Sequence, residues 1–168
     1  MTSPVALITG ANRGIGLALV SQLLTGGYKV VVLCRNASEK LTKLPVTIVD
    51  GCDVRSLESV QQAQKRCGDL ELDLVVNNAG LLTNETLSDI DDSAVTRILD
   101  QFTTNSLGPL LVTSVFKPYL KRGSKVAMIT SRMGSIDDNT SGSRYGYRMS
   151  KAALNIAAMS LSHDLRSD

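Results

Sequence analysis

The 168-residue sequence lacks Trp, has few aromatic residues and carries no strong excess of charge of either sign. With aromatic residues at 4% and a formal net charge of +2, it shows neither the stacking side chains nor the basic character of nucleic-acid binding. The apolar run at residues 30–34 is far shorter than the ~20 residues that span a membrane. We therefore expect neither nucleic acid nor a membrane as a partner.

Cysteine is also scarce. Cys34, Cys52 and Cys67 are too few and too irregularly spaced for a disulfide framework or a zinc site. We expect them to act as small apolar side chains in a reducing compartment, with no metal bound. The first residues show no basic region followed by an apolar run, so no signal peptide is predicted. The sequence therefore indicates a cytoplasmic protein.

Short apolar runs alternate along the chain with longer segments of helical spacing. The runs are continuous and mostly β-branched, as in strands covered on both faces, and lie at residues 5–8, 30–34, 46–49, 74–76 and 126–129. This alternation predicts an α/β fold of the three-layer Rossmann type, with helices on both faces of a parallel sheet. We expect about five strands in the order 3-2-1-4-5, within a single domain over residues 1–168.

A glycine-rich turn, TGANRGIG at residues 9–16, links the first strand to the first helix. Gly10 permits a tight turn, Gly14 lets a pyrophosphate approach the backbone, and Gly16 lets the helix pack on the sheet. The helix N-terminus offers free N–H groups and partial positive charge to the phosphates. The turn predicts a dinucleotide site rather than an ordinary corner. Also assigned to this site are Asn12, Arg13 and Ile15.

The second strand ends at Arg35, where sites for NAD commonly place a carboxylate on the ribose 2′-hydroxyl. Arg35 and Arg13 together suit a 2′-phosphate, because guanidinium groups make bidentate, charge-assisted hydrogen bonds. These residues therefore favour NADP, with NAD as the alternative cofactor. Two solvated arginines are the alternative interpretation.

Two further segments are candidates for the cofactor groove. Asp53, after the third strand, is placed to accept from the adenine amino group, and Val54 is assigned with it. The fourth strand ends in the motif NNAG, and Asn78, Ala79 and Gly80 are predicted to line the groove. The alternatives are a solvated turn aspartate and plain turn chemistry.

Tyr147 and Lys151 are four residues apart in a segment that reads as helix, so they share one face. A nearby ammonium group lowers a tyrosine pKa from about 10, which suits Tyr147 to proton transfer near neutral pH. A surface pair without a role is the alternative. Tyr145, six residues from Lys151, points elsewhere on a helix.

The motifs TGANRGIG, NNAG and YRMSK, in this order and at these intervals, resemble the short-chain dehydrogenase/reductase family over residues 5–165. The segments ITSRMGSIDDNTSG and YGYRMSKAALN are similar to its carbonyl-reductase branch, which includes C-factor and sniffer-type proteins. The resemblance implies NADPH-dependent reduction of a small carbonyl substrate by hydride transfer. The alternatives are a non-catalytic dinucleotide-binding or signalling protein, and an inactive truncated chain.

The resemblance also implies a catalytic tetrad. Tyr147 matches the family's acid/base residue, and Lys151 matches the residue that activates it and binds the nicotinamide ribose. Ser131, with Ser135 as a rival, matches the serine that binds the substrate carbonyl. Asn105 matches an asparagine that supports a proton-relay water.

The family pattern implies further structural features. Gly108 and Pro109 are expected to distort the helix that carries Asn105, because proline lacks an N–H. Relatives continue beyond the tyrosine helix into more strands and a substrate loop, so we expect an exposed edge at the fifth strand and an incomplete substrate pocket. The helices around 103–120 and 147–165 are expected to pair in a homodimer.

Overall fold

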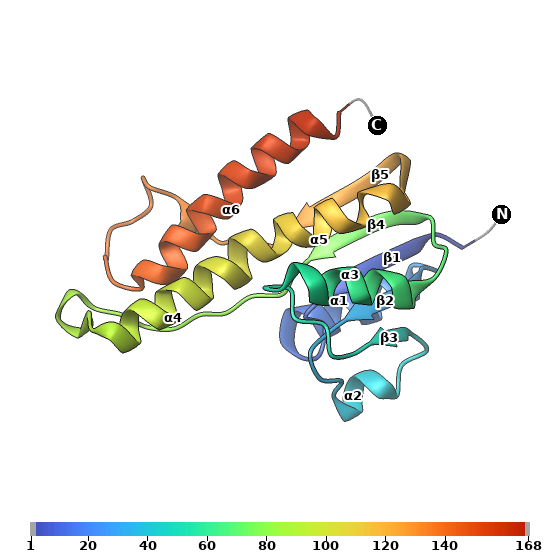
Figure 1. Cartoon of the computed structure of the whole chain (residues 1–168), viewed down its shortest axis with the longest axis horizontal. Coiled ribbons are helices and arrows are strands. Elements are labelled where there is room, and N and C mark those ends of the chain that lie inside the picture. The colour runs from blue at the N-terminus through green and yellow to red at the C-terminus, as the bar shows by residue number, and fades with distance from the viewer. Residues whose placement is uncertain (1–2, 167–168) are drawn as a thin grey trace. The chain divides into compact units, whose positions relative to one another are not determined.

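The structure, a computed structural model, describes residues 3–166. Its five strands form one sheet in the order β3-β2-β1-β4-β5, as predicted, and every neighbouring pair is parallel (Figure 1). The strands are β1 (Val5–Thr9), β2 (Lys29–Leu33), β3 (Thr47–Val49), β4 (Leu72–Asn77) and β5 (Leu120–Met128).

Helices fill most of the chain between the strands. They are α1 (Gly14–Thr25), α2 (Glu39–Thr42), α3 (Leu57–Cys67), α4 (Asp92–Phe102), α5 (Gly108–Phe116) and α6 (Tyr145–Asp164). Shorter turns are η1 (Leu87–Asp89), η2 (Thr103–Leu107), η3 (Lys117–Tyr119) and η4 (Arg132–Gly134). The single helical segment expected after the fourth strand is therefore divided into α4, η2 and α5.

The chain divides into two compact units. Among the described residues, the sheet unit contains residues 3–79 and 111–129, and the helical unit contains residues 80–110 and 130–166. The expectation of a single domain over residues 1–168 stays a prediction.

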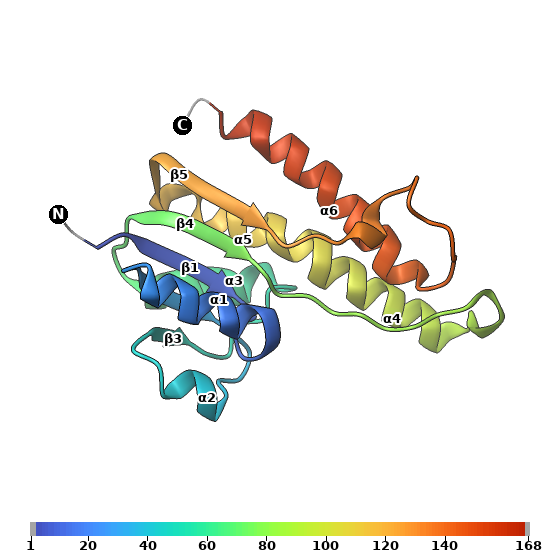
Figure 2. The same cartoon turned by 180° about the vertical axis from the view of Figure 1, so that it is seen from behind.

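Two apolar clusters cover the two faces of the sheet, which is why the strands are continuously apolar. On one face Leu7, Val31 and Val75 pack with Val60 of α3 and Phe116 of α5. The other face of the sheet, on the side of α1 (Figure 2), holds the residues that alternate with these along the strands. They pack against α1 and α2 in a cluster that includes Ile8, Val30, Val32, Val76, Val20 and Leu41. The three-layer arrangement follows from this alternation.

β5 is longer than the apolar run that predicted it. Its polar beginning pairs Leu120 with Leu72, and the register then shifts before Lys125 pairs with Leu74. The Ser124 hydroxyl holds the irregular stretch by donating to the Leu72 carbonyl at 2.6 Å. Within residues 3–166, β5 pairs on one side only and forms an edge of the sheet, as expected.

The cysteines are free thiols in the sheet unit. Cys34 and Cys52 are buried and Cys67 is half-buried. Burial raises the pKa of both Cys52 and Cys67 to about 11, which keeps these thiols protonated and unreactive. Across residues 3–166, no helix is both long and apolar enough to cross a membrane. The cytoplasmic location stays a prediction.

Candidate active site

The glycine-rich turn of the sheet unit has a different physical reason for each glycine. Gly10 has φ +67°, and a Cβ there would lie 2.7 Å from the Cα of Ala79. A Cβ at Gly16 would collide with the side-chain amide of Asn78 and the backbone of Ala11. Gly14 has φ +56° and faces open space. The turn is thus packed at two glycines and open at the third, the one expected to face a pyrophosphate.

The side chain of Asn78 anchors this turn by hydrogen bonds. Its Nδ2 donates to the carbonyls of Thr9 and Gly10 at 2.9 and 3.1 Å. In return, the Thr9 hydroxyl accepts from the N–H groups of Asn78 and Ala79 at 3.1 and 3.0 Å. The NNAG segment therefore locks the end of β1 to the end of β4.

The start of α1 combines open donors with an unsatisfied acceptor. The N-cap residue Arg13 makes no side-chain cap, and Arg13, Ile15 and Arg35 are exposed. Asn12 accepts from the Ser38 hydroxyl through its carbonyl at 2.7 Å. Its side-chain oxygen Oδ1 is buried without a hydrogen-bond partner among the described residues. Buried polar atoms are rarely left unpaired, so this one fits a ligand-bound turn.

Asp53 has a partner that the sequence did not reveal. Arg55 donates to its carboxylate from Nε at 3.0 Å and from Nη2 at 2.7 Å. This bond lowers the pKa of Asp53, so the group stays a carboxylate at neutral pH, and the charge of Arg35 acts in the same direction. Val54 is buried beside it. The assignment of Asp53 to the adenine amino group stays a prediction.

The four predicted catalytic residues lie in the helical unit. α6 carries Tyr147 and Lys151 one turn apart, and the Lys151 ammonium lies 5.7 Å from the centre of the Tyr147 ring. Lys151 is 4% exposed, and this burial lowers the pKa of its ammonium. Tyr147 is half-buried.

The turn η4 begins directly after Ser131 and packs against Lys151. The Ser131 hydroxyl accepts from the N–H of Met133 at 3.1 Å and so caps η4. A Cβ at Gly134 would lie 2.8 Å from the backbone of Lys151, so only glycine allows this approach. The rival Ser135 is exposed, and its hydroxyl accepts from the Asp138 N–H at 3.4 Å.

Asn105 lies in the predicted distortion, which takes the form of a π turn, η2. Pro109 cannot donate to the Asn105 carbonyl, and Gly108 donates to Thr103, five residues earlier. The Asn105 side chain binds both backbone groups of Leu81, at 2.7 and 2.8 Å.

The same amide reaches the tyrosine helix. Asn105 Nδ2 donates to the Ser150 hydroxyl at 2.9 Å, and Ser150 donates to the Tyr147 carbonyl at 2.8 Å. The side chain therefore ties the segment after β4 to α6, and the sequence carried no signal for this pairing.

Residues 4–168 match the sequence profile of the short chain dehydrogenase family. The chain belongs to this family. It is 37% identical over 164 residues to 1-hydroxy-2-glutathionyl-2-methyl-3-butene dehydrogenase of Rhodococcus sp., covering 96% of this chain and 71% of that protein. Oxidoreductase chemistry with a nicotinamide cofactor is the activity class of the family, in agreement with the sequence.

Solved structures of carbonyl reductases share the fold. NADPH-bound carbonyl reductase from chicken fatty liver superposes with a TM-score of 0.84 and 29% identity, over 99% of this chain and 76% of that one. Carbonyl reductase Sniffer of D. melanogaster has a TM-score of 0.84 and 28% identity, over 99% and 77%. The resemblance to the carbonyl-reductase branch is thus confirmed, while the residue roles stay predictions.

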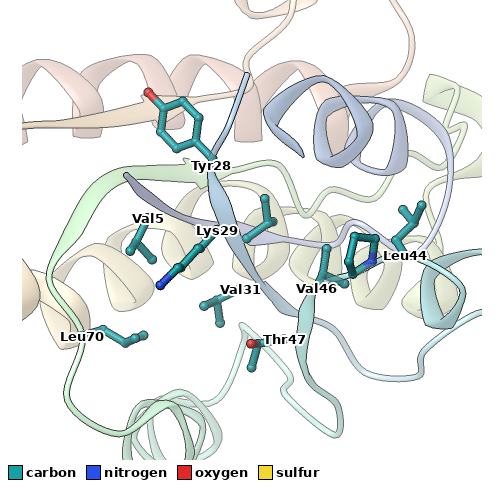
Figure 3. Close-up of a pocket in the computed structure, with 10 residues that line it drawn as sticks. Val5, Tyr28, Lys29, Val31, Leu44, Val46, Thr47 and Leu70 are labelled. Carbon is teal, nitrogen blue, oxygen red and sulfur yellow. The ribbon is translucent and has the colours of Figure 1, made fainter. Parts of the chain in front are cut away.

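A cavity of about 480 Å³ lies elsewhere in the sheet unit (Figure 3). Its lining includes Val5, Lys29 and Thr47, which begin β1, β2 and β3. The cofactor residues predicted between residues 10 and 80 follow the opposite, carboxyl ends of the strands, where open α/β sheets bind ligands. None of them lines this cavity.

Proposed function

We propose that this protein is an NADP-dependent oxidoreductase that reduces the carbonyl group of a small aldehyde or ketone. The observation that carries the proposal is the buried Lys151 ammonium beside the Tyr147 ring. A tyrosine hydroxyl in this position can act as a general acid towards a carbonyl oxygen. The carbonyl reductases among the solved relatives support the substrate class.

The residues of the sheet unit fit a dinucleotide. The open space at Gly14 and the N–H groups at the start of α1 would receive the pyrophosphate end, and the buried acceptor Asn12 Oδ1 would take a hydrogen bond from a hydroxyl of the cofactor. Arg13 and Arg35, both exposed, would bind the 2′-phosphate of NADP. When bound, the cofactor supplies the hydride that reduces the carbonyl carbon.

Side chains of the helical unit would transfer the proton to the carbonyl oxygen. The Tyr147 hydroxyl donates its proton to the carbonyl oxygen as negative charge develops there. The Lys151 ammonium stabilises the phenolate that remains. The Ser131 hydroxyl holds the same oxygen by a hydrogen bond. The products are the alcohol and the oxidised cofactor.

Binding and turnover measured together test this function. NADPH is titrated by its fluorescence, and its oxidation is followed with a panel of small aldehydes, ketones and quinones. We expect binding and reduction of at least one carbonyl compound. Binding without any turnover would favour a non-catalytic dinucleotide-binding protein, and no binding would favour an inactive chain.

Arg35→Glu is expected to lower the affinity for NADPH by about 10–100-fold, because it removes a charge-assisted bond to the 2′-phosphate and adds repulsion. Affinity for NADH, which lacks this phosphate, should change little. Fluorescence titrations with both cofactors measure the ratio. Arg122→Glu, the same charge reversal at an exposed position of β5, is the matched control. Equal losses for NADPH and NADH would contradict the assignment.

We further propose that the helical unit pairs with a second copy of the chain. α4, which lies directly before the helix expected to pair around residues 103–120, exposes Val95, Leu99 and Phe102 on one face. α6 exposes an apolar set at the same kind of helical spacing: Met149, Ile156 and Met159. Apolar residues gathered on a helix face are typical of an interface.

Light scattering after size exclusion is expected to give twice the chain mass of 18.0 kDa. Leu99→Glu, which places a charge on the α4 face, should give the monomer. A monomeric wild-type protein would contradict this pairing. We also propose the cytoplasmic location that is expected from the sequence.

A further inference from the structure

Two buried side chains link the segment after β4 to the first turn of α6 within the helical unit. Gln101 of α4 accepts from the Thr83 N–H through Oε1 at 3.0 Å. Its Nε2 donates to Glu85 Oε1 at 2.8 Å, and Glu85 Oε2 accepts from the Gly146 N–H at 3.3 Å. We call this chain from Thr83 to Gly146 the amide–carboxylate relay. Both side chains are 0% exposed.

The relay ends at a helix start that lacks its own cap. Arg144, the N-cap residue of α6, has φ 52° and makes no side-chain cap, and the first turn holds no acidic residue. The free N–H groups of a helix N-terminus carry partial positive charge and need acceptors. Glu85 supplies two of them: its carboxylate accepts from Gly146, and its backbone carbonyl accepts from the Arg144 N–H at 2.7 Å.

Close packing reinforces this contact. A Cβ at Gly146 would collide with Gln101 Nε2 and lie 3.0 Å from the Cα of Ile98. Glycine thus lets the start of α6 approach α4 closely enough for the relay to form. Gly146 is followed directly by Tyr147, so whatever holds Gly146 also holds the backbone of the tyrosine.

The order of groups in the relay is constrained. Both ends, the N–H groups of Thr83 and Gly146, are donors, so each of the two side chains between them must turn an acceptor outward, and one donor must meet one acceptor between them. The Thr83 hydroxyl also donates to Glu85 Oε1, and because a hydroxyl can equally accept, it suits either order. One carboxylate and one carboxamide meet this condition in either order. Two carboxamides cannot, because one pair of N–H groups must face each other. Two carboxylates would face each other with like charge.

We propose that Glu85 is a positioning residue for Tyr147, acting through the relay that sets the first turn of α6. This inference rests on the proposed function, in which Tyr147 donates the proton. Misplacing an acid by about 1 Å costs a large part of its rate, up to ~10²-fold. Glu85 therefore acts on turnover while contacting neither substrate nor cofactor.

Four proteins test the relay: wild type, Glu85→Gln, Gln101→Glu and the double variant Glu85→Gln/Gln101→Glu. Each single variant is expected to lower kcat about 10–100-fold, with the affinity for NADPH unchanged. The double variant restores one carboxylate and one carboxamide in reversed order, so its kcat is expected to return towards the wild-type value. Asp137→Asn, at an exposed position in the same unit, controls for the loss of one negative charge.

Amide hydrogen exchange at Gly146 and Thr83, measured by NMR, follows the relay without any enzyme assay. We expect fast exchange at Gly146 in Glu85→Gln and renewed protection in the double variant. Unchanged kcat and protection in Glu85→Gln would overturn the proposal, and so would a double variant that recovers neither. A wild-type protein that reduces no carbonyl compound would instead overturn the proposed function, and the exchange pattern would still decide whether the relay holds Gly146.

Discussion

Tyr147→Phe is expected to lower the turnover of carbonyl reduction by about 10²–10⁴-fold, the usual contribution of a positioned general acid. The substitution removes the proton that the carbonyl oxygen receives and keeps the ring that the Lys151 ammonium contacts. Hydride transfer would then have to proceed against an unprotonated oxygen. The affinity for NADPH should change little, so the loss should lie in kcat.

Steady-state kinetics with NADPH and a carbonyl compound measure this effect. Tyr145→Phe is the matched control, because Tyr145 belongs to the same helix and is half-buried like Tyr147. It should retain full activity. A fully active Tyr147→Phe would show that the proton comes from elsewhere and that the assigned role is wrong.

Phe116→Ala is expected to lower the free energy of unfolding by about 3–5 kcal/mol, the usual range for a buried phenylalanine. Phe116 is fully buried at the end of α5, and its ring centre lies 5.8 Å from that of Tyr119. It belongs to the cluster that joins α3 and α5 to one face of the sheet. The truncation leaves a cavity that these elements can fill only in part.

Urea unfolding followed by circular dichroism measures the loss. Leu57→Ala, at a half-exposed position of α3, serves as the control and should change the free energy of unfolding by about 0.5 kcal/mol or less. A loss below about 1 kcal/mol for Phe116→Ala would mean that the core collapses around the gap or that α5 contributes little to it.

The sheet order could be predicted because its cause is local. Continuous β-branched runs such as residues 30–33 are stable only when both faces are covered, and helices between them leave few topologies. The first residues of β5 could not be predicted in this way. Lys121 and Arg122 are exposed, and the pairing there depends on Ser124 and on the register with β4.

The local geometry of the candidate site was predictable to a similar depth, while the roles of its residues stay predictions. The glycine turn and the four-residue spacing of Tyr147 and Lys151 depend on backbone geometry within a few residues. The ion pair between Arg55 and Asp53 and the hydrogen bonds by which Asn78 anchors the turn were not predicted. Polar side chains such as these can pair with many different partners, and the sequence does not say which.

The sequence by itself determined the parallel sheet, its strand order, the open glycine turn and the pairing of Tyr147 with Lys151 on one helix face. Local spacing and apolar periodicity are enough for each of these. Only the tertiary structure decided that Glu85 is buried and that its carboxylate joins Gln101 to Gly146, which lies 61 residues after Glu85 in the chain. A buried carboxylate must find hydrogen-bond donors wherever packing brings them, and no local pattern encodes that choice.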